Sequence, residues 1–310
     1  MNLLNKSLLF IIFIAPPVVA WDRCHSDDLN RFFDMTTIDH VRYVPTPIER
    51  IYISNAFVAS VDSYDDDNDN GLGEYLGVPN GGATHIFYDK VLADKKLIRS
   101  PSRWYRSAIF DEERDTFDIN KSLDHSYKGS GWQRGHLAKK SDAKMIGQYA
   151  PCQTFVFANA VPMAGELNEG IWLGLENYIS TLAKEIVTEG GEGLWVVAGP
   201  IFNKRQAIDF IGADDEVPVA IPDAIFKVVF LEKPLSASAF IFDNKFLKPP
   251  KNYKSGKCDR DKNYDYRKNL TSVNHVERLA GLSFNLPMNI SKRIEPLPKI
   301  NKADKIGGCI

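Results

Sequence analysis

A guanidinium and an imidazole stand two positions apart in the stretch GSGWQRGHLAKKSDA, residues 129–143. Alternate residues of a β-strand share a face, so Arg134 and His136 would point the same way. Gly135 between them would let backbone or substrate approach closely. An imidazole titrates near neutral pH and can take a proton from water, while a guanidinium can bind a phosphate. The triplet therefore suggests phosphodiester hydrolysis, although three such residues also occur together by chance.

A second polar set follows in NAVPMAGELNEGIWLGLE, residues 159–176, which holds Asn159, Asn168, Trp172 and Glu176. Positions 168, 172 and 176 would fall along one face of a helix. Mg²⁺ takes oxygen ligands and keeps several waters, which suits an amide carbonyl and a carboxylate. About 12 Å of helical rise separates Asn168 from Glu176, so both should not touch one ion. Taken singly, Asn168 could be only a helix cap and Glu176 only a solvated surface residue.

These residues need a framework of strands and one long helix. Apolar, β-branched runs predict strands within 50–61, 85–92, 153–162, 193–202, 217–231 and 237–243. A helix is expected over about 170–188, and its buried stripe would be Ile171, Leu175, Ile179, Leu182 and Ile186. Residues 272–284 suggest a closing helix and strand. Because strands and helices lack a regular alternation, we expect an α+β fold with a mainly antiparallel sheet.

The N-terminal stretch MNLLNKSLLFIIFIAPPVVA resembles a secretory signal peptide, with cleavage after Ala20. The alternative is a membrane anchor, but the apolar run from Leu8 to Ile14 is short for a membrane span. We therefore expect a secreted or periplasmic protein with no membrane partner after cleavage. In an oxidising compartment the four cysteines predict two disulfides, and three pairings remain open. They are Cys24, Cys152, Cys258 and Cys309.

The net charge of −2 over 310 residues excludes a globally basic nucleic-acid binder, so a polyanion would need a local patch. The segment 245–262 repeats lysine every third residue around a Pro-Pro pair, and in a polyproline II segment these lysines would share an edge. A solvated loop is the alternative. The acidic segment 62–73 is interpreted as a solvated turn rather than a calcium loop, since Gly77 falls where a bidentate Glu belongs.

Taken together, the motifs resemble the DNA/RNA non-specific endonucleases of the ββα-metal (His-Me finger) fold, the group that includes the Serratia-type nuclease and endonuclease G. The resemblance rests on QRGH (133–136), NAVP (159–162) and NEGIWLGLE (168–176), followed in family order by VVAGPIF (196–202), IPDAIFKVV (221–229) and GLSF (281–284). It implies an endonuclease domain over 50–285, with its central sheet flanked by helices. The remaining segments would be a signal peptide (1–20), a leader (21–49) and a lysine-rich tail (286–310).

The resemblance also implies a role for each matching residue. His136 resembles the histidine that serves as general base in this family. Asn168 resembles the family's sole direct protein ligand of Mg²⁺, and Mn²⁺ is the alternative ion. Glu176 would hold a water on that ion, and Arg134 would face the scissile phosphate. The family also uses an upstream arginine to stabilise charge in the transition state, and Arg99 is favoured over Arg103 for this role. Supporting roles in the site are implied for Asn159, Gln133 and Trp172. Contacts to the substrate are expected from Arg103, Lys248, Lys251 and Lys254.

One position departs from the family pattern, because Gln133 stands where relatives most often have Asp. The predicted function is a secreted, sugar-non-specific endonuclease that cuts DNA and RNA to 5′-phosphate ends. The alternative is a catalytically weakened protein that binds nucleic acid or another polyanion on the same scaffold. The sequence does not determine a preference between DNA and RNA. It does not determine the oligomeric state either, and a homodimer is one option.

Overall fold

The computed structural model describes residues 49–53, 56–62, 78–79, 81–94, 104, 123–146, 150–203, 207–213, 218–245, 265–284 and 286–300. Several predicted features lie outside the described residues. They are the signal peptide, Cys24, Cys258, Cys309, most of the acidic segment 62–73, Arg99, Arg103, Lys248, Lys251 and Lys254.

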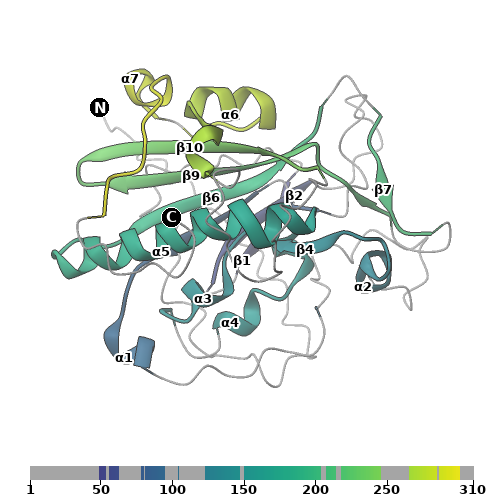
Figure 1. The fold of residues 1–310 in the computed structure, drawn as a ribbon, viewed down its shortest axis with the longest axis horizontal. Coiled ribbons are helices and arrows are strands. Elements are labelled where there is room, and N and C mark those ends of the chain that lie inside the picture. The colour runs from purple at the N-terminus through teal and green to yellow at the C-terminus, as the bar shows by residue number, and fades with distance from the viewer. Residues whose placement is uncertain are drawn as a thin grey trace, which may run out of the picture.

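A seven-stranded sheet in which every neighbouring pair is antiparallel forms the centre of the molecule (Figure 1), so the predicted α+β class is confirmed. Its strand order is β1-β2-β3-β6-β9-β10-β11. The strands span Glu49–Ile53 (β1), Val58–Asp62 (β2), Gly81–Ile86 (β3), Leu194–Ile201 (β6), Ala224–Glu232 (β9), Leu235–Asp243 (β10) and Leu270–Thr271 (β11). A separate small ladder pairs β7 (Phe210–Ile211) with β8 (Val219–Ala220).

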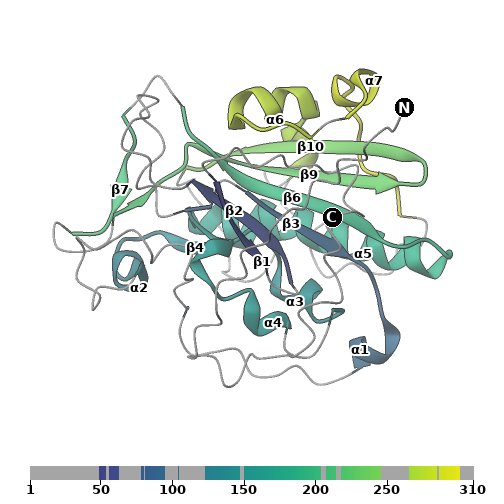
Figure 2. The same ribbon diagram turned by 180° about the vertical axis from the view of Figure 1, so that it is seen from behind.

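The middle strands are apolar on both faces because both faces are covered. In β6, Val196 and Ala198 belong to the core that includes α5 (Leu173–Thr188), whereas Trp195 and Val197 belong to a second core with α6 (Val273–Ala280). Figures 1 and 2 show α5 lying across one face of the sheet, with α6 and α7 (Met288–Ser291) on its other side. Alternation along each strand thus divides the apolar residues between two cores.

The long helix follows its predicted stripe: Ile171, Leu175, Ile179 and Leu182 are buried, and Ile186 packs against the same core. Its beginning differs from the prediction. Leu167–Trp172 forms a π-helix (η3), in which Gly170 has non-helical angles (φ −103°, ψ −105°), and regular α-helix begins at Leu173. Asn168 and Trp172 are therefore not one α-helical turn apart, and the expected uniform spacing of 168, 172 and 176 is wrong.

A two-stranded hairpin, separate from the seven-stranded sheet, carries the RGH triplet beside the N-terminal end of α5 (Figures 1 and 2). Strand β4 (Gln133–His136) pairs antiparallel with β5 (Ala160–Met163), as the strand prediction for 133–136 requires. Short elements surround it: α2 (Leu123–Tyr127), α3 (Lys140–Ala143), α4 (Ala150–Gln153) and the 3₁₀-helix η2 (Phe157–Asn159). In α4, Cys152 is buried and disulfide-bonded, while its predicted partners lie outside the described residues.

Asn244 joins this hairpin to the sheet. Its Oδ1 accepts a hydrogen bond from the Ala164 N–H (3.0 Å), and its Nδ2 donates to the carbonyls of Pro162 (2.8 Å) and Pro222 (2.9 Å). The side chain is buried at the end of β10, so these bonds satisfy backbone groups that water cannot reach. The segment leading from β5 into the π-helix is thereby fixed.

Three strand predictions differ from the structure, and the one over 153–162 is wrong before Ala160, because α4 ends at Gln153 and η2 occupies Phe157–Asn159. The prediction of strand over 85–92 is wrong beyond Ile86, since Asp89 Oδ1 accepts from the Leu92 N–H (3.0 Å) and starts α1 (Lys90–Asp94). After α6, Gly281 adopts a left-handed φ of 71° and Glu277 Oε1 accepts from the Phe284 N–H (2.8 Å). Residues 281–284 therefore fold back on the helix and form no strand.

The chain continues to pack on the domain after residue 285. Leu297 belongs to the core, and Tyr178 Oη on α5 donates to the Pro298 carbonyl (2.7 Å). The remaining short helix is the 3₁₀-helix η5 (Tyr266–Asn269). None of the helices in the described part of the chain has the length and apolar character needed to cross a bilayer.

Candidate active site

His136 ends β4 in an aromatic pocket. Its ring lies 4.5 Å from the Trp104 ring and 5.0 Å, edge-on, from Phe155, measured between centroids. The Nε2 atom is buried and has no hydrogen-bond partner among the described residues. Burial, with a smaller contribution from the charge of Lys140, lowers the pKa of His136 to about 4. The imidazole is therefore neutral at neutral pH and can accept a proton.

Arg134 lies on the same strand, and alternation places it on the same face as His136. Its guanidinium carbon lies 5.1 Å from the centre of the Tyr127 ring, a cation–π distance. The intervening Gly135 serves packing rather than the substrate approach expected from the sequence. A Cβ at position 135 would lie 2.5 Å from Met163 Cε and 2.7 Å from Met163 Cβ, so only glycine lets β4 pack on β5.

Asn159 holds the chain that leaves His136. Its Oδ1 accepts from the Ala138 N–H (2.8 Å), and its Nδ2 donates to the carbonyls of Ala138 and Thr154, each at 3.0 Å. The residue has no exposed surface. An amide committed to three backbone bonds is suited to support the site rather than to bind an ion.

Trp172 connects the helical side of the site to the strand side. Its indole Nε1 donates to the His136 carbonyl oxygen (3.3 Å), and its ring packs edge-on against Phe242 of the sheet. The side chain is almost completely buried. The end of β4 is thus held at a fixed place beside the start of α5.

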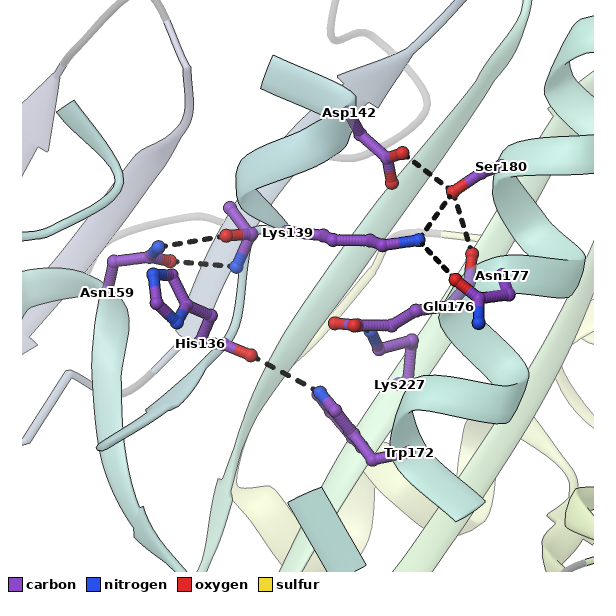
Figure 3. A network of polar contacts seen from close by, with 10 residues as sticks. His136, Lys139, Asp142, Asn159, Trp172, Glu176, Asn177, Ser180 and Lys227 are labelled. Atoms are coloured by element: carbon purple, nitrogen blue, oxygen red, sulfur yellow. Dashed lines mark hydrogen bonds and ion pairs between the residues drawn. The ribbon is translucent and has the colours of Figure 1, made fainter. Parts of the chain in front are cut away.

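Glu176 is not a solvated helix residue but half of a buried ion pair with Lys227 of β9. Lys227 Nζ lies 3.2 Å from Glu176 Oε1, and both side chains are buried. The same ammonium lies 3.9 Å from the centre of the Trp172 ring. Burial lowers the pKa of Lys227, and the carboxylate of Glu176 opposes that shift. Figure 3 shows the Glu176 carboxylate extending from α5 toward the side where His136 lies.

A further polar group joins α3 to α5 (Figure 3). Lys139 Nζ donates to Asn177 Oδ1 (2.8 Å) and Ser180 Oγ (3.0 Å), and Ser180 Oγ lies 2.6 Å from Asp142 Oδ1. Asp142 is buried, and burial raises the pKa of its carboxyl group. Sequence reasoning missed these residues and Lys227. Only Lys227 gave a signal, as a lone cation in the apolar strand IFKVVF.

Asn168 and Gln133 are brought together by the π-helix. Asn168 Nδ2 donates to Gln133 Oε1 (2.7 Å), and Gln133 Nε2 donates to Glu169 Oε1 (2.7 Å). Because the nitrogen of Asn168 faces Gln133, the carbonyl Oδ1 is the atom that could bind a cation. The described residues contain no cluster of three His, Cys, Asp or Glu side chains suited to a metal. An amide oxygen still suits a hard cation that keeps most of its waters.

Comparisons with known proteins identify the family of this chain. The family model for DNA/RNA non-specific endonucleases matches residues 63–289. The chain belongs to this family. It is 30% identical over 191 residues to "Nuclease EXOG, mitochondrial" of Xenopus laevis, an alignment covering 57% of this chain and 47% of the relative. The chain thus spans about half the length of that relative.

Two other relatives match longer stretches of the chain. "Endonuclease G, mitochondrial" of Homo sapiens is 28% identical over 208 residues, which cover 64% of this chain and 63% of the relative. A protein named "Nuclease" from Nostoc sp. is 30% identical over 235 residues, 71% of this chain and 77% of the relative. The endonuclease family predicted from the sequence motifs is therefore confirmed.

We predict that His136 in the metal-free protein titrates near pH 4 rather than 6.5. Imidazole signals followed by NMR from pH 7 to 3.5 would measure this, with His136→Asn to assign them. Since the folded state disfavours the proton, this group lowers stability as pH falls from about 6.5 toward 4 and has no such effect above 6.5. A midpoint at or above 6.5 would contradict the burial of Nε2.

Lys227→Met should destabilise the fold by about 3–5 kcal/mol, because it leaves the Glu176 carboxylate buried without its cation. Urea unfolding monitored by circular dichroism measures the change. Lys245→Met is the matched control: its ion pair with Asp243 is largely exposed, so it should change stability by at most about 1 kcal/mol. Equal effects of the two substitutions would show that the buried pair has no special role.

Proposed function

We propose that this chain is a metal-dependent endonuclease that hydrolyses phosphodiester bonds in both DNA and RNA and leaves 5′-phosphate ends. The observation that carries the proposal is the neutral, buried imidazole of His136, held beside Glu176 and its counter-ion in a member of this endonuclease family. Protein contacts to the phosphate backbone carry no base code, which suits an enzyme without sequence preference.

The proton transfer follows from the state of His136. The neutral imidazole would take a proton from water as the water oxygen bonds to phosphorus and the bond from phosphorus to the 3′ oxygen breaks. The pair of electrons of that bond leaves with the 3′ oxygen, which then gains a proton from solvent. Trp172 keeps the His136 backbone in place during this step, and Arg134 on the same strand face would contact the phosphate.

Asn168 Oδ1 would hold the divalent ion, with Mg²⁺ as the proposed species and Mn²⁺ as a substitute. A bound ion supplies positive charge for the phosphate and stabilises the departing 3′ oxygen. Glu176 would accept hydrogen bonds from water beside the ion, and Lys227 keeps that carboxylate in position. Asn159 and Gln133 would act as supporting residues, since both are engaged in hydrogen bonds to protein groups.

Parts of the proposal concern residues outside the described ranges. Export through the N-terminal segment, phosphate contacts from Arg103, Lys248, Lys251 and Lys254, and transition-state stabilisation by Arg99 remain predictions from the sequence. Two relatives carry the word "mitochondrial" in their names, so export of this chain is tested separately by N-terminal sequencing of the secreted protein.

The test is cleavage of plasmid DNA and of RNA by the disulfide-intact protein, with Mg²⁺ or with EDTA. We expect metal-dependent cutting that falls about 10²–10⁴-fold in His136→Ala. His275→Ala is the matched control, because His275 lies in α6 on the other side of the sheet, and it should cut at the wild-type rate. DNA retarded on a gel but uncut in any divalent metal would instead support the non-catalytic polyanion-binding protein.

A further inference from the structure

We propose that Glu169 is a positioning residue that acts through Gln133 to set which atom of the Asn168 amide faces the metal ion. The inference rests on the proposed metal role of Asn168 and concerns a residue to which the family resemblance gives no role. It also explains how this chain functions with an amide at position 133, where relatives most often have a carboxylate.

The direction of the two amides depends on which groups can donate a hydrogen bond. An ionised carboxylate only accepts hydrogen bonds, so Glu169 Oε1 requires that Gln133 turn its Nε2 toward it, and the two atoms lie 2.7 Å apart. Gln133 Oε1 then faces Asn168 and can only accept. Asn168 must therefore offer Nδ2, at 2.7 Å, and its Oδ1 is directed elsewhere. One carboxylate thus fixes the direction of two successive amides.

Without the carboxylate this direction would be lost. The nitrogen and oxygen of an amide are nearly the same size, so both side chains could rotate by 180° together and keep the hydrogen bond between them. Asn168 would then present two N–H donors to a cation, which cannot bind them. Hydrogen bonds to an ionised acceptor are about twice as strong as neutral ones, which favours the productive direction.

The backbone around the three side chains is arranged to hold them. Gln133 is paired with Met163 in the β4–β5 ladder, and Asn168 N–H donates to the Ala164 carbonyl (2.9 Å). Gly165 leaves room for the glutamine, because a Cβ there would lie 3.1 Å from Gln133 Nε2. The π-helix η3 contains both Asn168 and Glu169, and π-turns are frequent at functional sites.

The test measures Mn²⁺ affinity by calorimetry on the metal-free full-length protein, without substrate. Glu169→Lys replaces the acceptor by a donor, so Gln133 should turn Oε1 to the lysine and Nε2 to Asn168. Asn168 would then accept with Oδ1, and the affinity should fall at least about tenfold. Glu166→Lys is the charge control: it makes the same charge change three residues away, and we expect a fall of no more than about threefold. Its thermal unfolding is measured first, because Glu166 Oε2 is buried without a hydrogen-bond partner among the described residues.

A rescue variant separates orientation from charge and from misfolding. In Gln133→Glu/Glu169→Lys, the new glutamate pairs with the lysine and accepts from Asn168 Nδ2, so affinity should return to within about threefold of Glu166→Lys. Glu169→Gln, the least disruptive change, should weaken binding about twofold because half of the amide orientations become unproductive. Thermal unfolding monitors the fold of each variant.

The outcomes distinguish a failure of Asn168 as metal ligand from a failure of Glu169 as positioning residue. Loss of Mn²⁺ binding in Asn168→Ala, loss in Glu169→Lys and recovery in the double variant support the positioning role. If Asn168→Ala binds Mn²⁺ as the wild type does, the proposed metal ligand itself is wrong. If Asn168→Ala loses binding but Glu169→Lys matches Glu166→Lys, or the double variant shows no recovery, only the role of Glu169 is overturned.

Discussion

The buried ion pair between Lys227 and Glu176 is the interaction on which the geometry of the site depends. A lone charge in a protein core is costly, so burial of these two groups requires that they remain together. Lys227 projects from β9 in the middle of the sheet, and Glu176 lies in the first turn of α5. The pair therefore restricts both the rotation of α5 and its position along the sheet.

The same ammonium extends this constraint to β4, the strand that carries the proposed base. It lies against the Trp172 ring, and the Trp172 indole donates to the backbone of His136. Asn159 and Asn244 hold the two ends of β5, the partner strand of β4, through buried hydrogen bonds to backbone groups. Sheet, helix and hairpin thus form one connected frame, and the predicted catalytic side chains attach to its edges.

Local sequence patterns predicted much of the fold. The apolar stripe from Ile171 to Leu182 located the long helix, and the extended run around Arg134 and His136 located β4. The π-helix could not be predicted, because the spacing of apolar residues in 167–172 does not distinguish it from the α-helix that follows. The cap made by Asp89 and the left-handed Gly281 stand where two strands were predicted to continue, and each depends on a single residue.

Residues of the candidate site could be predicted only where the residue type carries its own chemistry. His136, Asn168 and Glu176 stand out for that reason, and the family motif unites them. The partners that orient them are distant in sequence: Gln133 meets Glu169 across 36 positions and Lys227 meets Glu176 across 51. No periodicity links such pairs. A lysine within IFKVVF indicates that a buried partner must exist, but only the packing of α5 on β9 identifies it.

The most direct test is anomalous diffraction from crystals of His136→Ala soaked with Mn²⁺ and a short oligonucleotide. We expect a single ion whose only direct protein ligand is Asn168 Oδ1, with a substrate phosphate between that ion and the position of the missing imidazole. An ion bound directly by Glu176 or Asp142, or a phosphate bound away from β4, would contradict the assignment of base and metal ligand.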